Sequence, residues 1–138
     1  MSPALLVLDD ELESRRRMIA SLDATTLRDQ YRILESGHAF LDACQVDSSA
    51  LRLVSLDHDL AMDDPLDGLD VTRELLLLPL EQLPSVIVHS SNGERAAIMM
   101  GEFELAGWRA ERVLPFGKHW IEDDWLATVR ERLDTERE

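Results

Sequence analysis

The sequence predicts one α/β domain in which five strand–helix units build a doubly wound parallel sheet. Short apolar runs alternate with amphipathic segments along the whole chain, which is the pattern of a repeated βα unit. Polar residues directly follow three of these runs, as expected where parallel strands end at a ligand-binding edge. The length of 138 residues suits a single domain with one core.

The first two units begin near the N-terminus. Residues 5–8 are expected to form a buried strand, and residues 12–22 an amphipathic helix. The core face of this helix would hold Met18, Ile19 and Leu22, and its arginines would face water: Arg15, Arg16 and Arg17. Residues 31–34 form a less apolar strand, expected toward a sheet edge, and residues 39–46 a helix with Cys44 in the core.

The third unit contains an unusually long connection. Its strand is expected at residues 51–56 and its helix at residues 69–78, ended by Pro79. Between them, residues 61–67 predict a loop, because paired aspartates, a proline and the following Gly68 interrupt regular structure.

The last two units complete the predicted fold. Residues 86–88 are β-branched and are expected in the middle of the sheet. Residues 94–105 predict a helix, residues 112–116 a short fifth strand, and residues 121–133 the final helix. The tryptophans are expected to complete the packing near helix ends: Trp108, Trp120 and Trp125.

No repeat or linker divides the chain, so the domain is expected to span residues 1–133, with a charged, fraying tail at 134–138. The net charge is −14, from 14 basic and 28 acidic residues. This charge disfavours nucleic acid and favours a divalent cation or a basic partner. No apolar stretch is long enough to span a bilayer. A single cysteine and the absence of a secretory signal favour the cytoplasm.

Three strand ends carry the polar residues that suggest a function. The first continues as Asp9-Asp10-Glu11, the third as Asp57-His58-Asp59, and the fourth as His89-Ser90-Ser91-Asn92. The carboxyl ends of parallel strands share one edge of a sheet. The sequence therefore predicts one polar pocket rather than three separate patches.

These residues also resemble a known family. Residues 5–11 read L-L-V-L-D-D-E and resemble the opening of response-regulator receiver domains. Asp57 closes the third strand, Ser90 the fourth, and Lys118 follows the fifth. The resemblance implies a flavodoxin-like fold with sheet order 2-1-3-4-5. It also implies an acidic pair that binds Mg²⁺, a phosphoryl-accepting Asp57, and phosphate contacts from the serine and the lysine.

Some details differ from ordinary receivers. The D-H-D-L motif, the long loop before Gly68 and the H-S-S-N cluster resemble a divergent branch, the cyclic-phosphate-processing receiver-like domains. Membership of that branch would imply action on a cyclic phosphate or a related nucleotide derivative. In addition, Lys118 follows Pro115-Phe116, whereas receivers usually place the lysine directly before the proline.

The resemblance and the chemistry assign roles to named residues. The metal ligands would be Asp9, Asp10, Asp57 and Asp59, the last through its backbone carbonyl, with Mg²⁺ or another divalent cation as the cofactor. The phosphate-binding residues would be Ser90, Ser91, Asn92 and Lys118. The catalytic residues would be Asp57, His58 and His89, because imidazole exchanges protons near neutral pH.

Strand alternation leaves some of these roles open. If Asp57 faces the pocket, His58 should point the other way, and the same rule separates His89 from Ser90. Structural roles therefore remain alternatives for both histidines. A helix cap remains the alternative for Asn92.

Three functions follow. The first is an atypical receiver-like domain whose acidic pocket binds or hydrolyses a small phosphoester, such as a cyclic phosphate; the residues leave open whether it is a metal-dependent phosphoesterase. The second is a phosphoacceptor receiver modified on Asp57 by a histidine kinase. The third is a degenerate receiver used as an interaction scaffold. A homodimer through the last helices is compatible with all three.

Overall fold

In the computed structural model, which describes residues 2–137 and the side chains of residues 2–134, five parallel strands form one sheet. Their order is β2-β1-β3-β4-β5, as predicted, with β2 at an edge. The strands are β1 (Leu5–Leu8), β2 (Tyr31–Leu34), β3 (Leu53–Leu56), β4 (Ser85–Val88) and β5 (Ala110–Arg112). The predicted fold class is therefore confirmed.

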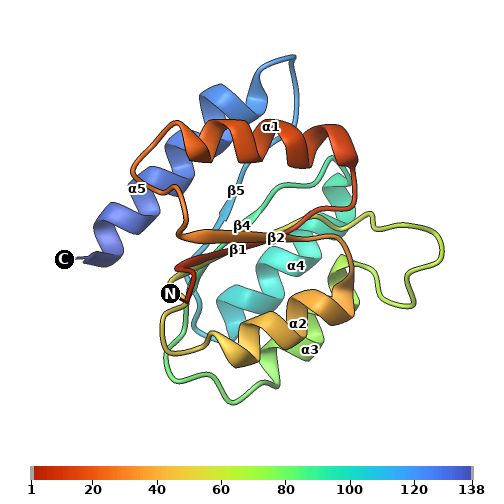
Figure 1. Cartoon of the computed structure of the whole chain (residues 1–138). Helices are drawn as coiled ribbons and strands as arrows, with labels where there is room; N and C mark the ends of the chain where they lie inside the picture. The colour runs from red at the N-terminus through yellow and green to blue at the C-terminus, as the bar shows by residue number, and fades with distance from the viewer. Residues whose placement is uncertain (1, 138) are drawn as a thin grey trace.

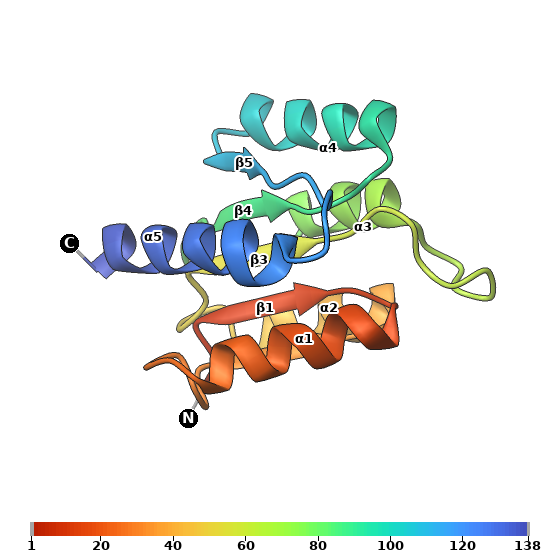
Figure 2. The ribbon, with the colours of Figure 1, turned by 90° about the horizontal axis from the view of Figure 1, so that it is seen from above.

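The helices cover both faces of the sheet. Figures 1 and 2 show α1 and α5 on one face, and α2, α3 and α4 on the other. The helices are α1 (Leu12–Asp23), α2 (Gly37–Val46), α3 (Gly68–Leu76), α4 (Gly93–Leu105) and α5 (Leu126–Arg137), with a π-helical turn, η1 (Ile121–Trp125), leading into α5. None of the described helices is long and apolar enough to cross a membrane.

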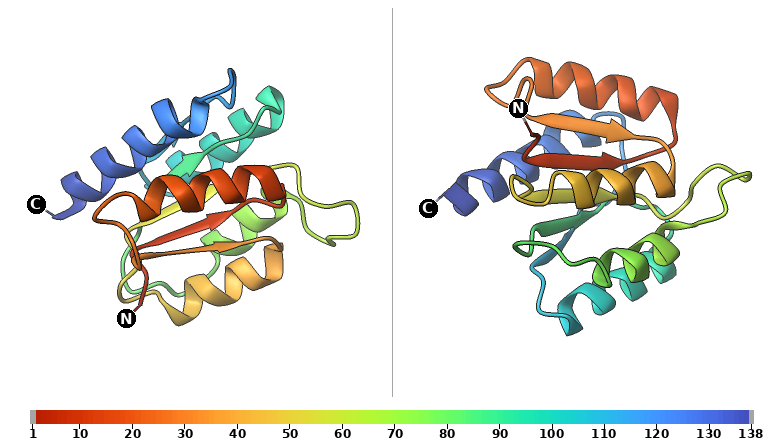
Figure 3. Two further views of the ribbon diagram at one scale, coloured as in Figure 1. Left: turned by 45° about the horizontal axis from the view of Figure 1, so that its top comes forward. Right: turned by 60° about the horizontal axis from the view of Figure 1, so that its bottom comes forward.

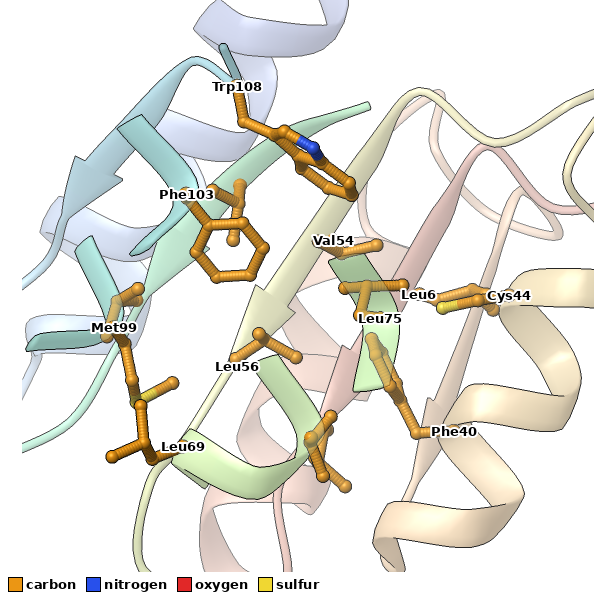
Figure 4. Close-up of a cluster of buried hydrophobic side chains, with 14 of the residues drawn as sticks. Leu6, Phe40, Cys44, Val54, Leu56, Leu69, Leu75, Met99, Phe103 and Trp108 are labelled. Atoms are coloured by element: carbon orange, nitrogen blue, oxygen red, sulfur yellow. The ribbon is translucent and has the colours of Figure 1, made fainter. Parts of the chain in front are cut away.

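Alternating strand residues supply two separate cores. Leu6 and Leu8 of β1 face the layer of α2, α3 and α4, whereas Leu5 and Val7 face α1 and α5. Figure 4 shows the first core, where Cys44 is fully buried, as predicted. Each fully buried valine, leucine, methionine or phenylalanine in this core contributes roughly 1.5–3 kcal/mol to the stability of the fold. The tryptophans complete the packing as expected: Trp108, Trp120 and Trp125 are at most 9% exposed.

Several element boundaries differ from the predicted ones. The fifth strand is not at residues 112–116: β5 pairs with β4 only over Ala110–Arg112, and Pro115 beyond it lacks the N–H that a longer ladder needs. The strand predicted at 51–56 begins only at Leu53. The third helix ends at Leu76 rather than 78, because Pro79 excludes helical bonding there.

The C-terminal segment and α1 also differ in detail. The final helix opens with the π-turn η1 and continues to Arg137, into the charged segment 134–138, whose last residue lies outside the described part. On α1, Ile19 is 41% exposed instead of buried. Arg17, which was predicted to face water, donates two hydrogen bonds to Glu122.

Candidate functional site

The strand register explains why three polar residues meet. Leu8, Leu56 and Val88 are paired across β1, β3 and β4. The residues that follow them are Asp9, Asp57 and His89, and their side chains leave the sheet on the same side because they occupy equivalent positions. All three line one cavity of about 190 Å³ at the carboxyl edge of the sheet.

Three carboxylates form the most acidic part of this site. Oxygens of Asp9, Asp10 and Asp57 lie within 4.8 Å of one another. Burial is the main cause that raises the pKa of Asp57 to about 6; His89 opposes this shift and Asp9 adds to it. Burial and the charge of Asp9 also raise the pKa of Asp10. A divalent cation would relieve this repulsion, and the all-oxygen donor set fits Mg²⁺.

Asp59 contributes to the turn after β3. Its backbone N–H donates to Asp57 Oδ1 at 3.3 Å, and its carboxylate contacts His58. The predicted use of its carbonyl as a metal ligand remains a proposal.

The two histidines occupy different environments. His89 is 2% exposed, with Nε2 3.0 Å from Asp9 Oδ2 and Nδ1 2.6 Å from Ser55 Oγ. Since both ring nitrogens have protein partners, this geometry favours a positioning role for His89 over the predicted role of proton carrier.

His58 points away from the cavity, as strand alternation predicts. Its Nδ1 lies 2.9 Å from Asp59 Oδ1 and its Nε2 3.5 Å from Asp67 Oδ2, at the N-terminus of α3. Its backbone carbonyl accepts a hydrogen bond from the Gly68 N–H at 2.8 Å. This arrangement favours a role in holding the β3–α3 loop rather than a catalytic one.

Of the residues after β4, one lines the cavity and the others form the turn and the cap that begin α4. Ser90 is 1% exposed, and its hydroxyl accepts a hydrogen bond from the Asn92 N–H. Asn92 caps α4 by accepting from the Arg95 N–H, which was the alternative to ligand binding. Ser91, and not Ser90, is among the described residues that line the cavity.

Among the described residues that line the cavity, the cationic side chain is Arg17, whereas the sequence predicted Lys118 as the phosphate-binding cation. The Lys118 side chain is exposed and is not among the described residues that line the cavity. Arg17 does line it, and its guanidinium donates to Glu122 at 2.7 and 3.1 Å and to the Lys118 carbonyl at 2.6 Å. The sequence analysis placed all three consecutive arginines in water and so missed this residue. The available signal was its spacing of three from Ser14, which also lines the cavity, because residues three apart share one helix face.

A second, larger cavity lies beside the acidic cluster and shares Asp10 with it. Its volume is about 380 Å³, and its walls come from the segment 35–38 and the β3–α3 loop: Glu35, Ser36, His38, Ala61, Asp63, Asp64 and Pro65. The β3–α3 loop extends outward from the carboxyl edge of the sheet (Figure 3). The candidate site is therefore larger than the acidic cluster alone.

Comparison with solved structures identifies the same fold. The chain is similar to the phosphorylated cyanobacterial phytochrome response regulator RcpA, with a TM-score of 0.72, 17% identity and 96% of each chain covered. It is similar to a CheY-like receiver domain from Methylobacillus flagellatus, with a TM-score of 0.65, 16% identity and 98% of each chain covered. It also resembles NtrX from Brucella abortus, with a TM-score of 0.66 and 26% identity over 99% of this chain and 28% of that one.

The sequence itself gives a narrower assignment. No protein of curated function matches the chain. The family model described as the cyclic-phosphate processing receiver domain matches residues 4–104. This match contains Asp9, Asp57 and His89, which line the cavity, and Asp10, which completes the acidic cluster. The chain therefore belongs to the cyclic-phosphate processing receiver domain family.

Proposed function

We propose that this receiver domain binds a divalent cation, most suitably Mg²⁺, and with it binds and hydrolyses a cyclic phosphodiester. Asp9, Asp10 and Asp57 would hold the cation. Arg17 and Ser91 would donate hydrogen bonds to the phosphate oxygens. The observation that carries the proposal is a cluster of three carboxylates, of which Asp9 and Asp57 line one cavity together with the guanidinium of Arg17 and the hydroxyl of Ser91.

The chemistry of the bound cation would be that of a Lewis acid that polarises a phosphate oxygen. The chain's own residues would bind and orient the ligand. Glu122 holds the Arg17 guanidinium through two hydrogen bonds, which presents it to the cavity in one orientation. In the reaction, the oxygen of water bonds to phosphorus, one ring P–O bond breaks, and the proton of water ends on the released hydroxyl.

A phosphoacceptor role for Asp57 is the second candidate, because Asp57 lies in the acidic cluster at the receiver position. Two observations favour the first. In phosphorylated receivers a hydroxyl and a lysine read the phosphoryl group. Here Ser90 is buried in the turn before α4, and the exposed Lys118 is not among the described residues that line the cavity.

Two assays separate these functions. Incubation with acetyl phosphate and Mg²⁺, followed by mass spectrometry, detects a phosphoryl group on Asp57. Incubation with 2′,3′-cyclic nucleotides and Mg²⁺, followed by ³¹P NMR, detects ring opening. We expect ring opening without stable phosphorylation. A mass gain that Asp57→Asn abolishes, with no ring opening, would establish the phosphoacceptor instead. If both assays fail and the protein binds no Mg²⁺, the function that remains is that of a degenerate receiver used as an interaction scaffold.

Replacing Arg17 with glutamine is expected to weaken binding of a cyclic nucleotide about tenfold to a hundredfold. A charge-assisted hydrogen bond to phosphate contributes about 1.5–3 kcal/mol, and each 1.4 kcal/mol is tenfold in affinity. Calorimetric titration in the presence of Mg²⁺ measures this change. Arg16→Gln is the matched control, because Arg16 is exposed on the same helix. Equal losses in both variants would contradict a direct contact.

The affinity for Mg²⁺ is expected to fall about tenfold per pH unit below about 6, and to change little between pH 7 and 8. Protons compete with the cation once Asp57 titrates, and its pKa is raised to about 6. Calorimetry at a series of pH values measures this dependence. An affinity that stays constant down to pH 5 would show that Asp57 is not a ligand.

A further inference from the structure

We propose that Ser55 and Trp125 are positioning residues that hold the His89 ring in one orientation and thereby aim the Asp9 carboxylate at the cavity. The proposal rests on the proposed metal site. Its residues come from β3, from η1 and from the end of β4, far apart in the sequence.

The direction of each hydrogen bond follows from donor chemistry. An indole N–H can only donate, and Trp125 Nε1 lies 3.0 Å from Ser55 Oγ. Ser55 Oγ accepts this bond, so its own hydrogen is directed elsewhere. Within the described part of the chain, the other hydrogen-bonding atom at Ser55 Oγ is His89 Nδ1, at 2.6 Å. A carboxylate can only accept, so in the neutral imidazole the ring hydrogen lies on Nε2, beside Asp9 Oδ2, and the serine donates to Nδ1.

This tautomer of His89 orients the Asp9 carboxylate. Nε2 is 3.0 Å from Asp9 Oδ2 and donates to it. The other oxygen, Asp9 Oδ1, accepts from the Glu11 N–H at 2.9 Å. With one donor on each oxygen, the plane of the carboxylate is defined, and the remaining lone pairs are available to a cation.

The residues in this series of hydrogen bonds are buried, so the loss of any one bond is costly. Ser55 and Trp125 are 0% exposed, and Asp9 and His89 are 2% exposed. Water cannot replace a lost partner there, and an unpaired buried polar group costs about 1–3 kcal/mol. The His89 ring also stacks on Trp120, with centroids 6.0 Å apart, which limits its rotation.

The π-helical turn η1 links this series of hydrogen bonds, the relay from Trp125 through Ser55 and His89 to Asp9, to the rest of the site. It supplies Trp125 at its end and Glu122 three residues earlier, and Glu122 holds Arg17. Such turns insert one extra residue into a helix and often occur at functional sites. The turn therefore supports both the carboxylate side and the cationic side of the cavity.

The first test is the protonation of the His89 ring nitrogens, measured by long-range ¹H–¹⁵N NMR on the metal-free full chain. We expect a hydrogen on Nε2 and none on Nδ1. In Ser55→Ala, Nδ1 loses its hydrogen-bond donor, so its ¹⁵N signal is expected to shift, whereas Asp9 still holds the hydrogen on Nε2. A wild-type spectrum with Nδ1 protonated would overturn the proposal. Because this measurement needs no metal, it is independent of the proposed function, which fails instead if the wild-type chain binds no Mg²⁺.

The second test is a double-mutant cycle on Mg²⁺ affinity. Ser55→Ala is expected to reduce the affinity about tenfold, as partners behind metal ligands typically do. In a His89→Gln background the same change is expected to have no further effect, because the relay acts through the imidazole. Equal losses in both backgrounds would overturn the proposal, since a general packing defect acts without the imidazole.

A conservative variant keeps the test valid if Ser55→Ala does not fold. Trp125→Phe removes the indole N–H but keeps an aromatic ring, and is expected to lower Mg²⁺ affinity a few-fold and to shift the His89 ring signals. The matched control is Trp108→Phe, because Trp108 packs against Phe103 in the opposite core. Unchanged His89 signals in Trp125→Phe, or equal changes in both variants, would overturn the proposal.

Discussion

Replacing Asp57 with asparagine is expected to stabilise the metal-free protein and to lower its Mg²⁺ affinity about 100-fold or more, which is about 3 kcal/mol. The loss follows because one of three clustered carboxylates is removed. The gain in stability follows because the native fold holds this carboxylate in a partly buried site, where burial is the main cause that raises its pKa from 3.8 to about 6.

The sign of the stability change depends on pH. The native state binds the Asp57 proton more tightly than the unfolded chain does, because its native pKa is the higher one. Stability from this group is therefore fully present below pH about 4 and is lost as the pH rises to about 6. The loss, about 3 kcal/mol at most, is absent in Asp57→Asn. The variant should thus gain stability at pH 7 and little at pH 4.

Thermal unfolding at both pH values, with and without Mg²⁺, measures these effects together. Wild type is expected to gain stability on addition of Mg²⁺, and Asp57→Asn to gain none. Asp42→Asn serves as the control, because it removes the same charge from an exposed position on α2. If Asp57→Asn and the control unfold alike in every condition, the carboxylate of Asp57 is neither strained nor a ligand.

Replacing Gly68 with alanine is expected to destabilise the fold by about 3 kcal/mol and to disturb the acidic cluster. A Cβ built on Gly68 would lie 2.4 Å from His58 Cα and 2.5 Å from the Asp57 carbonyl oxygen. Both are backbone atoms directly beside the site, so the turn after β3 must shift. Alanine would otherwise favour the helix by about 0.5–1 kcal/mol. The clash is larger than this gain, so the net change in the free energy of unfolding is a loss.

The matched control is Gly93→Ala. Gly93 is the first residue of α4, as Gly68 is of α3, but a Cβ there meets nothing within 4 Å. Chemical denaturation should show a loss for Gly68→Ala and almost none for Gly93→Ala, and Mg²⁺ titration should show weaker binding only in the first. Wild-type stability in Gly68→Ala would contradict the close approach of α3 to the β3 turn.

The edge where the site forms could be predicted from the sequence because it depends on short-range pattern. Apolar runs followed by acids and hydroxyls indicate strands and their carboxyl ends. In a parallel sheet those ends share one edge, so the meeting of Asp9 and Asp57 required only the register. The outward direction of His58 also followed from strand alternation, which separated His89 from Ser90 without determining which of the two faces the cavity.

The cationic side chain that lines the cavity could not be predicted in this way. Arg17 reaches the cavity because α1 packs beside η1, where Glu122 meets it. Lys118 lies beyond the end of β5, and its carbonyl accepts a hydrogen bond from that arginine. A residue's place along the chain does not reveal which side chain points into a space formed by several loops.

By itself, therefore, the sequence determined the α/β class, the number and direction of the strands and the acidic edge, because hydrophobic periodicity and strand ends are local properties. The tertiary structure alone determined that His89 is held between Asp9 and Ser55, that Trp125 donates to Ser55, and that Arg17 lines the cavity. These contacts join residues far apart in the sequence, and their geometry depends on how helices pack on the sheet, which no local pattern encodes.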